Sequence, residues 1–150
     1  MFSRESASQI RSRFFTRFGK YMAPVPFAGG EKNSWINYKT GIKSIFIRID
    51  TASDAVSIGF QIEHPDAMVR QMYYNRFLDL QPLFAEIVGP DFTWSRQYSS
   101  GEGQVVSWIY DRLENTTVLN ENNWPDIISF LKPRLIALDN FWWQVSDQFE

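Results

Sequence analysis

The chain has 150 residues, with 17 acidic against 15 basic side chains, no cysteine, and hydrophobic and aromatic fractions of 44% and 17%. This composition excludes a disordered chain, a disulfide framework and a thiolate metal site, and the net charge of −2 argues against nucleic acid as the main partner. No stretch approaches the roughly 20 apolar residues that cross a bilayer, and charges stand where a signal peptide needs its apolar run. We therefore expect one cytoplasmic domain over residues 1–150, with no membrane contact.

The first predicted element is an amphipathic helix over residues 6–22. Apolar residues recur along it at helical spacing and share one face: Ile10, Phe14, Phe18 and Tyr21. The helix also carries basic residues that are candidates for contact with a phosphate backbone or an acidic partner: Arg11, Arg13, Arg17 and Lys20. The alternative is that these bases form the solvated side of a surface helix.

Residues 35–65 have the pattern of three short strands joined by two tight turns. Gly41 supplies the positive φ of the first turn, and residues 51–54 form the second. These turns predict four facing pairs: Ile36 with Ile45, Ile45 with Phe60, Ile47 with Ile58, and Ile49 with Val56. The aliphatic side chains of all three strands then lie on one face, so the two turns support the same register.

A long helix is predicted next, over residues 65–88, with a kink at Pro82. A second hairpin follows, with strands at 92–98 and 105–113, and a C-terminal helix begins at about Trp124 and is interrupted at Pro133. The order α-βββ-α-ββ-α predicts an α+β fold, in which helices pack on an antiparallel sheet of about five strands.

The polar face of the predicted three-stranded segment is a candidate ligand-binding surface, with an aromatic floor, amides and charged groups. In the predicted register Phe46 lies beside Gly59, so that its ring covers bare backbone. The candidate residues are Trp35, Asn37, Lys39, Ser44, Phe46, Arg48, Gln61, Glu63 and His64. The alternative is the solvated face of a half-buried sheet.

Catalytic and metal sites find little support in the sequence. The predicted register places Asp50 and Glu63 about 26 Å apart, whereas a catalytic metal pair is bridged over about 4 Å. His64, the only histidine, precedes Pro65 at the start of a helix, where a boundary role suits it as well as general-base catalysis. No nucleotide-binding or nucleophile-elbow motif occurs, so we assign no catalytic residue, no metal and no cofactor.

Three tracts carry a family resemblance: W-x-N-Y-K-T-G-I-K-x-I-F-I-R, I-x-F-Q-I-E-H-P and W-P-D-I-I-S-F-L-K-P-R-L-I-A-L-D-x-F-W. With them the chain resembles, over most of its length, a bacterial family known as domain of unknown function 4268. The resemblance implies an α+β domain in a bacterial, cytosolic setting and no established activity. Similar domains also form the C-terminal part of longer chains with a nuclease-like front half, a link by association only.

The leading functional hypothesis is a non-enzymatic binding or interaction module without a cofactor, with a protein partner or a homodimer as its target. The second is an accessory nucleic-acid-binding domain associated with nuclease or restriction-type systems. The third is a hydrolase that uses Glu63, His64 and Lys39. Phe141 and Trp143 would mark an association surface if they were exposed, although we expect them to be core.

Overall fold

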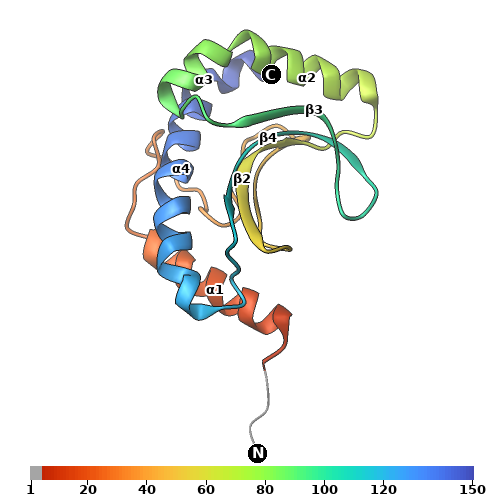
Figure 1. The fold of residues 1–150 in the computed structure, drawn as a ribbon. Coiled ribbons are helices and arrows are strands. Elements are labelled where there is room, and N and C mark those ends of the chain that lie inside the picture. Colours follow the sequence, from red (N-terminus) through yellow and green to blue (C-terminus); the bar gives the residue numbers. More distant parts are fainter. Residues whose placement is uncertain (1–4) are drawn as a thin grey trace, which may run out of the picture.

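The structure, a computed structural model, describes residues 5–150 and has the element order α-ββ-αα-ββ-α, with two short 3-10 turns in its C-terminal part. A curved, four-stranded antiparallel sheet is covered on its convex face by helices (Figure 1). The helix α4 runs along that face, α1 crosses one end of α4, and α2 and α3 lie across the other end (Figure 1). The predicted α+β class is confirmed.

The first helix, α1 (Ala7–Met22), begins at a capping box. The Ser6 hydroxyl accepts a hydrogen bond from the Gln9 N–H, and the Gln9 side chain accepts one from the Ser6 N–H. Its buried side chains are Phe14, Phe18 and Met22. Tyr21, which was expected on this face, is 48% exposed, because Met22 continues the four-residue spacing from Phe18.

The strands are β1 (Ile45–Asp50), β2 (Ala55–Ile62), β3 (Thr93–Ser99) and β4 (Val105–Glu114), in the spatial order β1-β2-β4-β3. Every pairing is antiparallel. The second predicted hairpin is confirmed as β3 and β4. Because β1 and β3 are the outer strands, each has one side without a neighbouring strand.

The predicted strand at residues 35–39 is wrong, and the sheet therefore has four strands. The carbonyl oxygen of the Asn33 side chain accepts hydrogen bonds from the N–H groups of Ser34 and Lys39, at 2.7 and 2.9 Å. This closes residues 33–39 into a local turn that satisfies backbone groups a strand would need for its ladder. Gly41 does have a positive φ of 84°, as predicted, but it leads out of this turn and not out of a strand.

The predicted register between β1 and β2 is displaced by two residues. Ile45 faces Ile62, Ile47 faces Phe60, and Ile49 faces Ile58. The loop is longer than expected, because the last β1–β2 pair joins Asp50 to Ser57, while Ala55 and Val56 pair with β4 instead. An even displacement keeps every side chain on its face, so the prediction that the aliphatic side chains point inward together is confirmed for these two strands.

Gly59 faces Arg48 and Tyr110, and Phe46 faces Gln61, so the predicted placement of Phe46 beside Gly59 is wrong. A Cβ atom at Gly59 would lie 1.7 Å from the carbonyl oxygen of Ile109. The absent side chain therefore lets β4 approach β2 closely where the sheet curves.

The predicted long helix is divided into α2 (Ala67–Asp79) and α3 (Gln81–Ile87). Pro82 lies in the first turn of α3, so the break falls where a kink was expected. The last long helix, α4 (Trp124–Val145), contains Pro133 without ending there. Pro133 and Ser129, four residues earlier, are both exposed, so water can hydrogen-bond the carbonyl that the proline leaves unpaired, and the predicted interruption is wrong.

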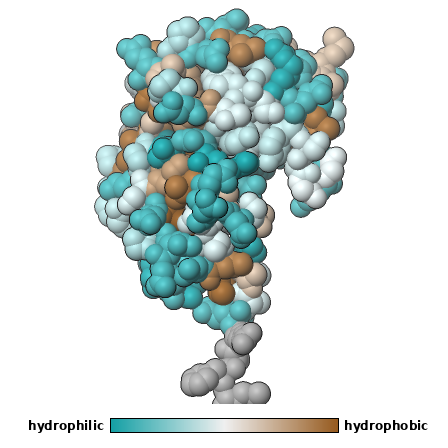
Figure 2. Space-filling view, viewed as in Figure 1, coloured by the Kyte–Doolittle hydropathy of each residue, from teal (hydrophilic) through white to brown (hydrophobic). Residues whose placement is uncertain are grey.

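Aromatic rings fill the space between the sheet and α4. Phe60 of β2 contacts Phe77, Phe141 and Trp142, with ring centroids 5.1 to 5.9 Å apart. Phe141 is core, whereas Trp143 is 61% exposed. On the side shown in Figure 2, hydrophobic residues lie in separate patches among hydrophilic ones. Within residues 5–150, no helix combines the length and the apolar character that a membrane span requires.

Candidate functional site

The predicted binding surface is divided by the fold, because Trp35 is a core residue. Its indole N–H donates a hydrogen bond to the Val25 carbonyl at 3.1 Å, and its ring stacks on Phe27 with centroids 4.1 Å apart. Trp35 is only 5% exposed. It therefore supports the irregular segment between α1 and β1, residues 23–44, which we call the connector.

Four of the predicted residues do meet on the sheet. Arg48 donates two hydrogen bonds to the Glu63 carboxylate, at 2.7 and 3.1 Å, and its guanidinium lies 4.0 Å from the ring centroid of Phe46. Gln61 faces Phe46 across the ladder. Because Arg48 engages both carboxylate oxygens of Glu63, this cluster is a charge-paired surface of the sheet.

Ser44 and His64 have structural partners. The Ser44 carbonyl accepts a hydrogen bond from the Glu63 N–H at 2.8 Å. His64 lies at the start of α2, where its Nδ1 accepts the Asp66 N–H at 3.0 Å and its carbonyl accepts the Arg70 guanidinium at 2.7 Å. These contacts match the boundary role considered for His64.

The distance between Asp50 and Glu63 must be derived again from the observed register. Asp50 faces Ser57 and not Ala55, and Glu63 pairs with Ser44 and not Ile42. Six residues of strand still separate the two pairs, which is about 20 Å. Within the part of the chain that the structure describes, no group of three or more His, Asp or Glu side chains is arranged to hold a metal ion.

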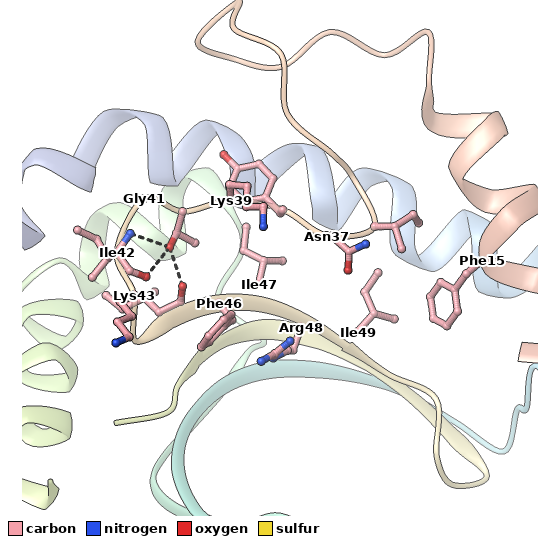
Figure 3. A pocket seen from close by; sticks show the side chains of 14 residues that line it. Phe15, Asn37, Lys39, Gly41, Ile42, Lys43, Phe46, Ile47, Arg48 and Ile49 are labelled. Atoms are coloured by element: carbon pink, nitrogen blue, oxygen red, sulfur yellow. Dashed lines mark hydrogen bonds between the residues drawn. The ribbon is translucent and has the colours of Figure 1, made fainter. Parts of the chain in front are cut away.

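A groove of about 660 Å³ lies between the connector and the outer side of β1 (Figure 3). Asn37 and Lys39 project from the connector, Ile47 and Ile49 from β1, and Phe15 of α1 lies at one end (Figure 3). Four of the predicted site residues therefore line this groove: Asn37 and Lys39 on the connector, and Phe46 and Arg48 on β1.

Backbone groups of β1 face the groove. The hydrogen bond from the Glu63 N–H to the Ser44 carbonyl sets the alternation of the antiparallel pair. Even-numbered residues of β1 bond to β2, and odd-numbered residues turn their N–H and C=O groups outward. Those of Ile45 are bonded to the Ile42 carbonyl and the Thr40 hydroxyl, at 3.1 and 2.6 Å. Those of Ile47 and Ile49 have no hydrogen-bond partner within residues 5–150.

The connector is held away from β1 by bonds to α4. Asp139, a buried carboxylate of α4, accepts hydrogen bonds from the Ala28 N–H at 2.7 Å and from the Tyr38 hydroxyl. Burial, with this hydrogen bond adding to it, raises the pKa of the Tyr38 phenol far above its ordinary value. The Trp142 indole N–H donates to the Thr40 carbonyl at 2.8 Å. One wall of the groove is thus fixed to the core of the molecule.

The groove is basic. Its fourteen lining residues include Lys39, Lys43 and Arg48 and no acid. Arg48 is already paired with Glu63, but Lys39 and Lys43 are exposed and make no ion pair with the other described residues. Two positive charges are therefore available to a ligand.

Two of the four basic candidates of α1 contact acidic side chains. Arg13 forms ion pairs with Glu5 at 3.0 Å and with Glu121 at 2.6 Å, and Arg17 lies 3.9 Å from Glu121. Both guanidinium groups lie over the Trp124 ring. Hydrogen bonds to Glu5 and Glu121 raise the pKa of Arg13, and the bond from Arg13 lowers that of Glu121. Lys20 is exposed and Arg11 is half-buried.

The sequence reasoning missed the outward backbone groups of β1 and the role of Asp139. A single acid inside the apolar seam of the last helix, in "LIALDNFWW", was the signal for a buried carboxylate with partners elsewhere. The outward backbone groups left no such signal in the sequence. Residues 35–39 have the composition of a strand, and this strand was predicted to pair with β1.

A comparison with family models shows to which family the chain belongs. The model described as Domain of unknown function (DUF4268) matches residues 10–146. The chain belongs to this family. No curated protein and no solved structure matches it. The range that matches the DUF4268 model contains every residue that lines the groove, and Asp139 as well.

Proposed function

We propose that the protein is an interaction module that binds an extended polypeptide segment as an additional strand beside β1. The supporting observation is that the N–H and C=O groups of Ile47 and Ile49 face the groove without partners in the described chain. Outer strands with such groups are templates for pairing with another chain, and several kinds of peptide-binding domain use them in this way.

The fixed connector adds support. A connector of this length could lie against β1 and cover it, but hydrogen bonds that Asp139 accepts and Trp142 donates hold its two halves at α4. Binding would then require little ordering of the groove walls, which preserves affinity.

Other roles have less support. In an accessory nucleic-acid-binding domain the bases of α1 would contact phosphates, yet Glu121 lies within 4 Å of both Arg13 and Arg17. A hydrolase that used Glu63 as a base would first have to separate it from Arg48. We also propose a bacterial, cytoplasmic setting, on the strength of the family resemblance and the absence of cysteine.

The test uses the full chain and a random-sequence peptide library displayed on phage. For the selected peptides, amide hydrogen exchange is measured with and without peptide. We expect the amides of Ile47 and Ile49 to exchange rapidly in the free protein and slowly in the complex, because only the complex gives them partners. The Arg48 amide, already bonded to β2, should change little.

A proline variant provides a second readout. Ile47→Pro removes one outward N–H and should weaken binding about tenfold, the value of one well-made hydrogen bond. Ser99→Pro is the matched control, because its N–H points outward from the other outer strand, β3. Urea unfolding shows whether both variants fold, and if Ile47→Pro does not, the exchange pattern of the unaltered protein decides. A failure to select peptides, or peptides that leave the Ile47 and Ile49 amides in rapid exchange, would contradict the proposal.

A further inference from the structure

Charge and shape differ between the two ends of the groove. Lys43 and Lys39 lie toward the start of β1, whereas Ile49 and Phe15 lie toward its end (Figure 3). From this asymmetry we infer that the bound segment belongs to another protein and is acidic at one end and apolar at the other. The inference rests on the proposed function and specifies the partner for the same site.

The apolar end follows from strand alternation. Residues that pair directly with Ile47 and Ile49 turn their side chains to the same side as those isoleucines, toward the space beneath the connector. Phe15 lies near Ile49 (Figure 3), and Ile36 also lines the groove; both are partly buried hydrophobic residues. An aliphatic or aromatic side chain opposite Ile49 therefore finds apolar partners.

The acidic end follows from the two lysines. Both side chains are exposed, and the groove lining contains no acid that would neutralise them. An acidic residue opposite Ile47, or just beyond it toward Lys43, would lie within reach of at least one ammonium group. Complementary charge of this kind increases the association rate and selects against basic segments.

The length of the segment is limited at the same end. The outward groups of Ile45 are occupied by the Thr40 hydroxyl and the Ile42 carbonyl, so an added strand can pair only with Ile47 and Ile49. Four backbone hydrogen bonds are available in an antiparallel arrangement. Because so few backbone bonds form, the charged contacts account for a large share of the difference in affinity between segments of different sequence.

A second copy of this chain fits the groove poorly. Antiparallel pairing of two β1 strands through Ile47 and Ile49 would be centred on Arg48 and would place the two Arg48 side chains directly opposite each other. Like charges at facing positions destabilise a sheet. Because this repulsion opposes self-association, an acidic partner is favoured over a second copy.

The experiment compares the selected peptides in matched pairs, each acidic peptide with its version carrying Gln for Glu and Asn for Asp. Affinity is measured for the unaltered protein, the double variant Lys39→Glu, Lys43→Glu, and the control Lys20→Glu on the exposed side of α1. We expect acidic residues to be enriched at one end of the selected peptides. The double variant should bind them at least tenfold more weakly and the control should bind them unchanged, because two attractions become two repulsions.

The possible outcomes distinguish three questions: whether the partner is acidic, whether a second copy binds, and whether any strand is added at β1. Peptides that slow exchange at Ile47 and Ile49 but show no acidic enrichment and no response to the double variant would overturn the acidic partner, with strand addition left intact. Protection of these amides that increases with protein concentration and without peptide would identify a second copy as the occupant. If no peptide slowed exchange at Ile47 and Ile49, the proposed function itself would be overturned.

Discussion

The two outer strands of the sheet differ in how their unpaired sides are treated. At β3 the ladder contains a bulge between Ser95 and Tyr98, and the Arg96 carbonyl at this point accepts a hydrogen bond from the Ser107 hydroxyl at 2.8 Å. Arg96 also reaches α2, where it donates to Asn75 at 3.0 Å. Bulges and charged side chains are devices that keep a sheet from pairing with other chains.

At β1 these devices are weaker. The strand pairs with β2 without a bulge, and its outward groups at Ile47 and Ile49 face a groove and not a helix. The unpaired side of β3 is therefore protected against pairing with another chain, and the unpaired side of β1 is accessible. The difference supports the proposed strand addition at β1, and substitutions at each place in this contrast can break or sharpen it.

The largest effect is expected from Gly59→Ala, which would separate the two central strands, β2 and β4, and with them the two outer strands. The added Cβ would lie 1.7 Å from the Ile109 carbonyl oxygen in the neighbouring strand. This clash is with backbone, so β4 must move away from β2 and ladder hydrogen bonds must break. We expect a loss of about 3 kcal/mol or more in the free energy of unfolding, measured with urea.

Gly101→Ala is the matched control for Gly59→Ala. Gly101 lies in the loop between β3 and β4, where an added Cβ would meet no atom within 4 Å. Its unfolding midpoint should stay close to that of the unaltered protein. Equal stability of the two variants would show that β2 and β4 tolerate a wider separation, and the explanation for the curvature would then be wrong.

Sequence reasoning succeeded where the deciding signals are local. The hairpin of β3 and β4 was located because alternation and a glycine-rich loop stand together in the chain. It failed at residues 35–39, where the Asn33 side chain closes a turn in a segment of strand-like composition. It also placed the β1–β2 loop two residues too short, because Ala55 and Val56 pair with Glu114 and Leu113 of β4, 59 and 57 residues later in the chain.

The groove could not be predicted from the sequence, for a different reason. Of the nine predicted surface residues, Phe46, Arg48, Gln61 and Glu63 do gather on the sheet. The groove itself depends on Asp139, which is 101 residues from Tyr38 in the chain. A contact over that separation leaves no periodicity to detect, and only the fold brings its two partners together.

A smaller effect, confined to the β1 side, is expected from Asp139→Ala. The substitution leaves the buried Tyr38 hydroxyl and the Ala28 N–H without their acceptor. We expect a loss of about 2 to 4 kcal/mol in the free energy of unfolding. Exchange of the Ala28 amide should accelerate, and binding of the selected peptides should weaken because one wall of the groove is no longer fixed.

The control for Asp139→Ala is Asp147→Ala. Asp147 is exposed, and its side chain makes no hydrogen bond or ion pair with other residues in the range 5–150. It should leave stability, Ala28 exchange and peptide binding unchanged. If Asp139→Ala lowered stability but left peptide affinity intact, the connector would not need α4 to keep the groove open.

The smallest effect concerns the pH dependence of the same contact. The pKa of Tyr38 is raised in the folded protein by burial and then by Asp139, so above pH of about 10 the unfolded chain loses a proton that the folded chain retains. Stability contributed by this group is complete below that pH and declines above it, by up to about 1.4 kcal/mol per pH unit. In Tyr38→Phe the hydroxyl is absent, so this component of the decline disappears.

Urea unfolding at a series of pH values from 8 to 11 should therefore give a flatter profile of stability against pH for Tyr38→Phe above pH 10. At neutral pH the variant is less stable than the unaltered protein, because it lacks one hydrogen bond. Parallel profiles for the two proteins would mean that Tyr38 ionises as readily in the folded chain as in the unfolded one, and that Asp139 of α4 does not hold its hydroxyl.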